Sequence, residues 1–390
     1  MKLNQILKQI DAEELTGVCR GLIRFKTVNP PGDELEAAQF VLDYLRQAGF
    51  EGEIVPNGAR RGSVLARFKG SGESPALALN GHLDVVPVGA ERWRHEPFEG
   101  VVEDGKVWGR GSADMKGGLA AMLVAARLLA QSGLRLRGDL VVLATAGEEV
   151  EMLGARSLAA HPHLGLLKAI LISEPTLNRL GLAERGVFWP EFVTHGQTAH
   201  GSTPDLGRNA ILMMVALLSE LDRLAIPYTP HPVLGHFTRS INTIKGGVKV
   251  NVVPDQACAL VDMRTVPGQD HSELLRHLED FVQDLERRVP GLNASVRLTY
   301  DLPPAETSPD EPVVKAFQEA VREANGHTPD SAVVRFATEA AIFVPALGVP
   351  TLIYGPGDPA LAHQPDEHVQ LEKMVEATRA YLAAAVRLLE

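Results

Sequence analysis

The sequence predicts an α/β fold, in which a mostly parallel sheet carries helices on both faces and an α+β domain is inserted into the chain. Two observations support this prediction. Short continuous apolar runs alternate with helical segments in the first part of the chain, a pattern typical of parallel strands that are buried on both faces. From about Leu182 this pattern gives way to alternating strands and amphipathic helices, and it returns after about residue 298.

The main domain is predicted to supply the parallel sheet and the helices that cover it. Helical periodicity occupies residues 3–25, 33–49, 117–133 and a segment near 153–161. Apolar runs predict strands at residues 63–68, 75–86, 138–147, 167–173 and 349–355. Asp33 is a candidate N-cap for the second helix, and Gly49 is its expected stop.

The inserted segment is predicted to be a compact α+β domain. Strand-like alternation and helical periodicity follow one another at residues 186–202, 207–224, 241–266 and 272–289. The third of these stretches indicates two strands around a Gly-Gly turn. We therefore predict a main domain of residues 1–182 and 298–390, with an inserted domain of residues 183–297.

The composition limits the classes of function. A chain of 390 residues with 45% apolar and 22% charged residues is typical of a globular protein with two domains. Its net charge of -11 disfavours a nucleic-acid partner, and no stretch approaches the ~18 apolar residues of a membrane span. Only Cys19 and Cys258 occur, so neither a disulfide framework nor a thiolate metal site is expected. We therefore expect a soluble cytoplasmic protein without nucleic-acid or membrane partners.

Polar side chains follow the predicted strands at the points where these strands end. The residues at these ends are His82, Asp84, Glu148, Glu149 and Glu174. Asp114 lies in a Gly-rich loop directly before a helix, and His363 follows the last strand. Because open parallel sheets bind ligands beyond the carboxyl ends of their strands, these side chains form the candidate site.

The residue types in this set favour a pair of metal ions. Two imidazoles and three carboxylates, from His82, Asp114, Glu149, Glu174 and His363, suit zinc, cobalt or manganese. They are too many for one tetrahedral catalytic zinc that must keep an open position, but they fit two ions bridged by one carboxylate. Asp84 lies two residues from His82, so both side chains face the same way and its carboxylate can orient the imidazole.

Each of these residues also has a simpler interpretation when it is taken alone. A single histidine, or an aspartate in a Gly-rich loop, is more often a hydrogen-bonded turn residue. Glu148 and Glu149 could form a solvated helix N-terminus, where acidic side chains interact favourably with the dipole. "GRGSADMKGG" lacks the spacing of a phosphate-binding loop, so a nucleotide site is disfavoured. The joint appearance of all these residues at strand ends favours the metal site.

Six motifs resemble those of one known family over nearly the whole chain, in order. They are "GHLDVVP", "GRGSADMKGG", "AGEE", "SEPT", "HGQTAHGS" and "GPGDPALAHQPDEHV". The family is that of the dinuclear zinc amidohydrolases and peptidases, which includes acetylornithine deacetylase, succinyl-diaminopimelate desuccinylase, aminoacylase and glutamate carboxypeptidase. The resemblance implies that residues 1–182 and 298–390 form a zinc-binding catalytic domain, and that residues 183–297 form a lid and dimerisation domain.

The resemblance also implies a role for each residue of the candidate site. His82 and Glu174 would hold one zinc, Glu149 and His363 the other, and Asp114 would bridge the two ions. Asp84 would orient His82, Glu148 would be the general base, and the peptide bond after Asp114 would be cis. Cobalt or manganese could replace zinc.

The resemblance implies three further roles within the inserted domain. His200 would donate a hydrogen bond to the scissile carbonyl oxygen, across to the partner's active site in a homodimer. Asn251 and Arg264 would help to bind substrate, Arg264 through a charge-assisted grip on a carboxylate. Alternatively, Arg264 is a surface residue of a strand.

The expected activity is hydrolysis of the amide bond in a small N-acyl amino acid. The "TEA", "GPG" and "AHQPDE" elements are most similar to those of acetylornithine deacetylase. A desuccinylase and a metallo-carboxypeptidase or dipeptidase use the same metal chemistry and remain alternatives. An inactive metal-binding scaffold is disfavoured, because a degenerate relative is expected to lose a ligand or the base and every one is present here.

Overall fold

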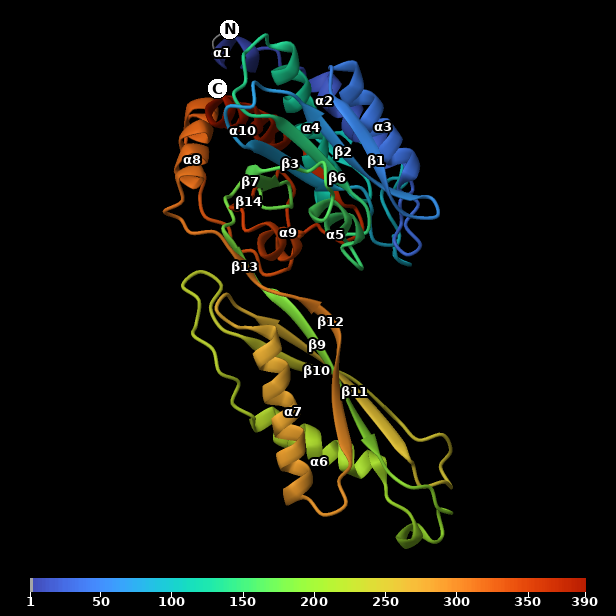
Figure 1. Ribbon diagram of the computed structural model, residues 1–390. Coiled ribbons are helices and arrows are strands. Elements are labelled where there is room, and N and C mark those ends of the chain that lie inside the picture. Colours follow the sequence, from blue (N-terminus) through green and yellow to red (C-terminus); the bar gives the residue numbers. More distant parts are fainter. Residues whose placement is uncertain (1–2) are drawn as a thin grey trace. The chain divides into compact units, whose positions relative to one another are not determined.

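The computed structural model describes residues 3–390, which divide into two compact units (Figure 1). The first unit runs to Leu182 and also contains Glu306–Val333 and Thr338–Glu390, whereas the second contains Ala183–Ala305 and Val334–Ala337. The second unit extends beyond residue 297, where the sequence pattern predicted the insert to end, because strand β12 (Ala294–Leu302) pairs with β9 (Gly186–His195).

A six-stranded sheet forms the centre of the first unit. Its order is β1 (Glu51–Gly58), β2 (Arg61–Phe68), β6 (Leu140–Thr145), β3 (Ala76–His82), β7 (Leu167–Ile172) and β14 (Thr351–Ile353). The last four strands pair in parallel, while β1 is antiparallel to β2 and β2 is antiparallel to β6. The prediction of a mostly parallel sheet is confirmed, and the antiparallel pairs lie at one edge.

Helices cover both faces of this sheet. They are α1 (Leu3–Leu7), α2 (Ala12–Arg24), α3 (Leu35–Gln47), α4 (Gly117–Gln131), α5 (Leu153–Ala159), α8 (Pro312–Asn325), α9 (Ala340–Leu347) and α10 (Leu371–Leu389). On β6, Leu140, Val142 and Ala144 belong to the large apolar core that α4 and α10 complete. Val141 and Leu143 are equally buried but point to the opposite face, because side chains alternate along a strand.

Two predicted helix boundaries differ from those in the structure. The helical pattern of residues 3–25 is divided between α1 and α2, because Asp11 is an N-cap whose side chain accepts from the Glu13 N–H. The next helix begins at Leu35 and is not capped by Asp33, which has a positive φ of 85°. The Asp33 carboxylate instead pairs with Arg60.

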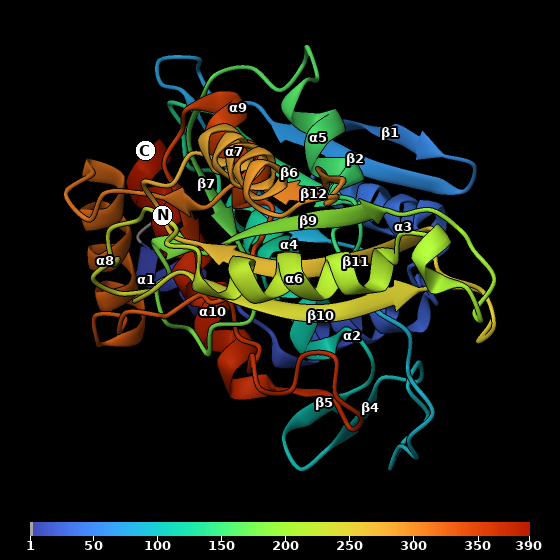
Figure 2. The same cartoon turned by 90° about the horizontal axis from the view of Figure 1, so that it is seen from below.

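The second unit is a four-stranded antiparallel sheet with two helices packed on the same face (Figure 2). The strand order is β10 (Thr238–Gly246), β11 (Gln256–Thr265), β9 and β12, and the helices are α6 (Ala210–Arg223) and α7 (His271–Arg288). The connection between β10 and β11 is longer than the predicted Gly-Gly turn. Its residues 251–253 hydrogen-bond to residues 199–201 and therefore do not form a tight hairpin.

A small three-stranded sheet in the first unit joins two loops that are distant in sequence. Its strands are β15 (His368–Gln370), β5 (Lys106–Trp108) and β4 (Val101–Glu103). The short strands β8 (Ala183–Glu184) and β13 (Ala305–Glu306) form a separate pair. Within residues 3–390, no helix has both the length and the apolar character required to cross a membrane.

Candidate metal centre and active site

The candidate site lies where the parallel strands of the first unit end. His82 is the last residue of β3, the pair Glu148 and Glu149 follows β6, and Glu174 follows β7. Asp114 lies in the turn Ser112–Lys116 directly before α4. Because β3, β6 and β7 are parallel neighbours, their carboxyl ends bring these side chains to one edge of the sheet.

Asp114 lies between the two histidines of the site. Its Oδ1 atom is 3.1 Å from Nε2 of His82, and its Oδ2 atom is 3.5 Å from Nε2 of His363. Nε2 of His363 is also 3.1 Å from Oε2 of Glu149. A carboxylate with one oxygen towards each imidazole is well placed to bridge two ions.

Two overlapping groups of metal-binding side chains share His82. One nitrogen or oxygen atom from each of His82, Glu148 and Glu174 lies within 4.8 Å of the others, and the same holds for His82, Asp114 and Glu149. The Oε1 atoms of Glu149 and Glu174 are buried, yet neither has a hydrogen-bond partner among the described residues. Buried carboxylate oxygens without partners are costly, so their arrangement fits bound cations.

The carboxylates of the site strongly affect one another's charge. Burial, followed by the negative charge of Glu174, raises the pKa of Glu148 well above its ordinary value. Burial and the charge of Asp114 do the same for the pKa of Glu174. Burial lowers the pKa of His82. Its hydrogen bond to Asp114 and the charges of Glu174 and Glu148 outweigh this effect, so the pKa lies well above its ordinary value. Divalent cations would reverse these effects by compensating the acidic groups.

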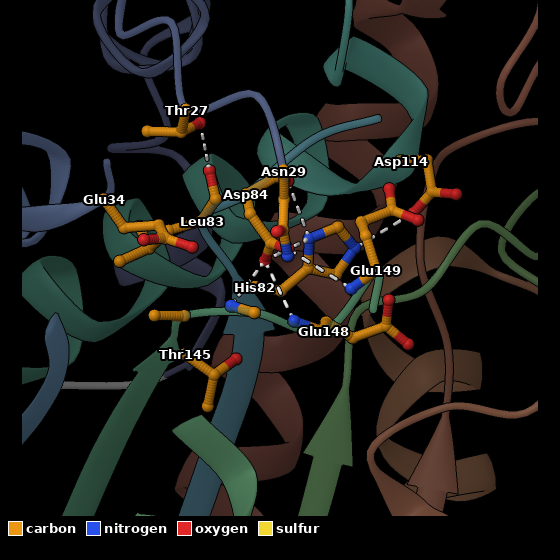
Figure 3. Close-up of polar contacts among 12 residues, drawn as sticks. Thr27, Asn29, Glu34, His82, Leu83, Asp84, Asp114, Thr145, Glu148 and Glu149 are labelled. Carbon is orange, nitrogen blue, oxygen red and sulfur yellow. Dashed lines mark hydrogen bonds and ion pairs between the residues drawn. The ribbon is translucent and has the colours of Figure 1, made fainter. Parts of the chain in front are cut away.

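Asp84 fixes the turn that carries the two adjacent glutamates (Figure 3). Its Oδ1 atom accepts from the main-chain N–H groups of Gly147 and Glu148 at 3.0 and 3.1 Å, and its Oδ2 atom accepts from that of Glu149 at 3.2 Å. Oδ2 also accepts from the Asn29 side chain at 2.8 Å. Four donors thus hydrogen-bond to the Asp84 carboxylate, two to each oxygen.

The contact between Asp84 and His82 differs from the expected one. Nδ1 of His82 lies 3.0 Å from the main-chain oxygen of Asp84, but 3.7 Å from its carboxylate. The main-chain carbonyl is therefore the group that orients the imidazole, because the carboxylate is turned towards the glutamate-bearing turn.

A buried ion pair that the sequence reasoning missed joins the two ligand loops. Glu367 accepts from the main-chain N–H groups of Gly111, Ala113 and Asp114 at 2.9 to 3.0 Å. It also pairs with Arg110, whose guanidinium donates to the main-chain oxygen of His363 at 3.4 Å. Both residues stand inside quoted motifs, but only the fold shows that they hold the loops of Asp114 and His363 together.

The Gly-rich motif serves the packing of α4 against β7. A Cβ atom on Gly118 would lie 2.1 Å from Oγ of Ser173, the residue that precedes Glu174. A side chain at this position would push the start of α4 away from the strand end. The peptide bond between Asp114 and Met115 is cis, as the family resemblance implied.

Glu339 is a second buried residue that the sequence reasoning did not identify. Its Oε2 atom accepts from the side chains of Asn80 and Thr145, at 2.8 and 2.7 Å, while its Oε1 atom has no hydrogen-bond partner in the described part of the chain. Burial raises its pKa to about 7, and the hydrogen bonds from Thr145 and Asn80 oppose this rise. Glu339 therefore places a carboxyl group beneath the ligand-bearing ends of β3 and β6.

Glu339→Gln is expected to reduce the loss of stability with rising pH. With a folded pKa of about 7 against an ordinary 4.5, the native protein retains a proton that the unfolded chain has lost, so stability falls as pH rises through this window. The full effect is about 3 kcal/mol at most, at about 1.4 kcal/mol per pKa unit. A glutamine can keep an accepting oxygen at the Oε2 position and place its amide nitrogen at the Oε1 position, which has no hydrogen-bond partner within residues 3–390.

Denaturant unfolding of metal-free protein at about pH 5 and about pH 8 checks this prediction, since the native-state pKa of about 7 lies between the two pH values. Exposed Glu372 provides a control, because Glu372→Gln should keep the wild-type difference between the two pH values. If Glu339→Gln protein showed the same difference in stability between the two pH values as wild type, Glu339 would not be the group that titrates.

His200, Asn251 and Arg264 all belong to the second unit. His200 is exposed, with its Nδ1 atom 2.7 Å from Oγ of Ser202, and the main-chain oxygen of Asn251 accepts from the Gly201 N–H at 2.8 Å. Arg264, on β11, donates through Nε to Asp262 at 2.9 Å. His200 and Asn251 are therefore on neighbouring segments, and the roles of all three residues stay predictions.

The chain is similar to two enzymes over most of its length. The chain is 32% identical over 384 residues to a probable succinyl-diaminopimelate desuccinylase of Staphylococcus epidermidis, covering 90% of this chain and 91% of the relative. It is also 32% identical over 360 residues to acetylornithine deacetylase of Myxococcus xanthus, covering 89% and 91%.

Solved structures share the whole fold at lower identity. An M20 family metallo-carboxypeptidase of Sulfolobus solfataricus matches with a TM-score of 0.79 at 20% identity, over 97% of this chain and 99% of that one. A dinuclear metal-binding peptidase of the M20 family from Bacillus subtilis matches with a TM-score of 0.74 at 20% identity, over 97% and 98%.

A family model supplies the assignment. Residues 78–387 match the model of peptidase family M20/M25/M40, and this range includes all five candidate metal ligands as well as Glu148. The chain is thus a metal-dependent hydrolase, and it belongs to peptidase family M20/M25/M40.

Proposed function

We propose that this protein hydrolyses the amide bond of a small N-acyl amino acid with the help of two zinc ions, which cobalt or manganese can replace. The observation that carries the proposal is the gathering of five nitrogen and oxygen ligands at the strand ends, with Glu148 beside them. All these ligand types suit zinc, cobalt or manganese.

In the proposed centre, each ion has its own histidine and its own glutamate. His82 and Glu174 would hold one ion, and His363 and Glu149 the other. Asp114 would bridge them, which its contacts to both imidazoles support. The arrangement leaves Glu148 free of a fixed ligand role, although it lies within the same cluster.

Ions bound there would polarise the amide carbonyl and lower the pKa of an attacking water. Glu148 would accept the proton of that water and deliver it to the leaving nitrogen as the C–N bond breaks. Asp84 would keep Glu148 in position through its hydrogen bonds to the 147–149 turn. His200 would donate to the oxygen on which negative charge develops.

The proposed substrate class is an N-acyl amino acid with a free carboxylate. Acetylornithine deacetylase is among the 32% identical relatives, and Arg264 and Asn251 would bind the substrate. Hydrolysis of succinyl-diaminopimelate is the second candidate, because the relative at 32% identity over 384 residues bears that name. A carboxypeptidase or dipeptidase activity is the third, on the basis of the shared fold.

A substrate panel separates these candidates. Protein supplied with zinc or cobalt would be assayed with acetylornithine, acetyl-lysine, succinyl-diaminopimelate, N-acyl methionine and dipeptides. We expect the highest kcat/KM for an acetylated amino acid. A preference for the succinyl substrate or for dipeptides would replace the first candidate by the second or third, and no release of amine from any substrate would contradict amide hydrolysis.

We further propose a cytoplasmic homodimer formed through the second unit. Apolar side chains are exposed on this unit at Leu206, Leu212, Val215, Ile244, Val248 and Val250. Strand β10 also forms an edge of its sheet and leaves its main-chain groups open to pairing. Exposed apolar residues beside an open strand edge favour association with a second copy. Both cysteines are free thiols, as suits a reducing compartment.

Mixed dimers test whether His200 acts across the dimer. Neither His200→Ala nor Glu148→Gln protein should turn over substrate, but a hybrid dimer would contain one site with both groups intact. Equal mixing gives hybrids in half of the dimers, so about a quarter of wild-type activity should return. No recovery, despite subunit exchange verified by mass spectrometry of differently tagged chains, would place His200 in its own protomer's site, and an active His200→Ala protein would place it outside catalysis.

A further inference from the structure

A second cluster of metal-binding side chains lies in the first unit, apart from the candidate centre. It consists of Glu53, His161 and His163, each of which offers one nitrogen or oxygen atom within 4.8 Å of the other two. Glu53 is on the edge strand β1, whereas the two histidines flank Pro162 in the connection between α5 and β7. The cluster thus joins two segments that are distant in sequence.

The main chain that carries the histidines is held in place from β2. Arg67 donates to the main-chain oxygens of His163 and Leu164, at 2.9 and 2.7 Å, and pairs with Asp139 at 2.5 Å. The Leu164 N–H also donates to the main-chain oxygen of His161 at 3.0 Å. Because the backbone is fixed on both sides of Pro162, the main-chain positions of the two histidines are set before any ligand binds.

The side chains themselves are close together and open to solvent. Nδ1 of His163 lies 2.9 Å from Oε1 of Glu53, and the two imidazole centroids are 5.2 Å apart. The His163 and Glu53 side chains are 72% and 50% exposed. Water molecules can therefore occupy the remaining coordination positions of a metal ion that is bound by three protein atoms.

An ordinary surface ion pair between Glu53 and His163 does not account for His161. Among residues 3–390, the only hydrogen bond to the His161 ring comes from the His163 main-chain N–H at 3.4 Å, which leaves the other ring nitrogen available. An exposed ion pair contributes little to stability and needs one imidazole. The imidazole of His161, whose backbone is held in place, would serve as the additional ligand of a metal ion.

We propose that Glu53, His161 and His163 bind a divalent cation of the kind that prefers imidazole, namely Zn²⁺, Ni²⁺ or Cu²⁺. Such an ion would link the edge strand β1 to the connection between α5 and β7. It takes no part in amide hydrolysis, since none of its ligands belongs to the centre formed by His82 and its neighbours.

Zinc titration of the full, chelator-treated chain tests this site by counting bound ions. The double variant His161→Ala/His163→Ala should bind one equivalent of Zn²⁺ fewer than wild type, with kcat unchanged. His327→Ala is the matched control, because His327 is also an exposed histidine of the first unit but belongs to none of the metal-binding groups found within the described residues. It should bind as many equivalents as wild type.

Electron paramagnetic resonance with Cu²⁺ gives a second measurement that does not depend on stoichiometry. Wild type should show a copper signal with coupling to two nitrogens that is absent from the double variant and weakened in Glu53→Gln. Equal zinc equivalents in wild type and the double variant, or an unchanged copper signal, would show that Glu53 and His163 form an ion pair only and would overturn the proposal.

Discussion

Glu148→Gln is expected to abolish turnover while the protein keeps its bound metal. The substitution preserves the size and the burial of the side chain but removes its ability to accept a proton. Loss of a positioned general base lowers the rate on the order of 10²–10⁴-fold. We therefore expect kcat to fall by at least about 100-fold, in line with the lower end of that range.

The structure makes Glu148 the appropriate target for this test. Its main-chain N–H is fixed by Asp84, and its carboxylate lies within 4.8 Å of ligand atoms of His82 and Glu174. Burial and the charge of Glu174 raise its pKa well above the ordinary value, and bound cations would counteract that rise. Burial and the bound cations thus act on the Glu148 pKa in opposite directions, which suits a carboxylate that must first accept a proton and then release it.

Glu149→Gln is the matched control, because it changes the adjacent residue in the same way. Oε2 of Glu149 is 3.1 Å from Nε2 of His363, so this carboxylate is expected to act as a ligand. Elemental analysis should find less metal in Glu149→Gln and the wild-type amount in Glu148→Gln. Loss of metal from Glu148→Gln would show instead that Glu148 is a ligand, and near-normal kcat would contradict its role as the base.

The sheet and its polar edge could be predicted from local patterns in the sequence. Each buried strand is a continuous apolar run, and His82, Glu148, Glu149 and Glu174 stand at the end of such a run or soon after it. His82 closes β3 and Glu174 follows β7, so a rule about the carboxyl ends of parallel strands was sufficient to place them together. These features depend on only a few neighbouring residues.

Contacts that depend on distant parts of the chain could not be predicted in this way. Arg110 and Glu367 are 257 positions apart, and Asn80 and Glu339 are 259 positions apart. The sequence around a charged residue does not show whether its side chain is buried, or which distant residue it contacts. The pairing of β12 with β9 was missed for the same reason, because its alternating pattern does not specify its partner strand.

The spacing of Asp84 and His82 in the sequence did not predict what the Asp84 carboxylate contacts. Spacing placed its side chain on the same side of the strand as that of His82. The carboxylate is instead occupied by the N–H groups of residues 147–149 and by Asn29. The turn that presents those N–H groups follows β6, which pairs with β3 in the sheet, and the two-residue spacing gave no information about that pairing.

Asp84→Asn is therefore expected to damage both the catalytic turn and the stability of the fold. Oδ1 accepts from two donors and Oδ2 accepts from two others. Whichever way the new amide is turned, its NH2 group faces two N–H donors that then have no acceptor. An unsatisfied buried donor costs about 1–3 kcal/mol, so unfolding should become easier by about 2 kcal/mol or more.

Activity should fall as well, because the turn holds Glu148 against the metal ligands. A shift of about 1 Å in a catalytic group lowers the rate on the order of 100-fold, and we expect kcat to fall by about that factor. Asp280→Asn makes the same chemical change at an exposed position of α7 and should alter neither quantity. Denaturant unfolding and steady-state kinetics on the two variants provide the measurement.

The two readouts together distinguish a positioning role from a purely structural one. If Asp84 only stabilised the fold, the folded variant would retain wild-type kcat at temperatures well below its unfolding midpoint. If it positions Glu148, kcat remains low in protein that is fully folded, while KM changes little because the substrate-binding residues are untouched. Wild-type kcat in folded Asp84→Asn protein would therefore mean that the four hydrogen bonds to Asp84 are not needed to place the general base.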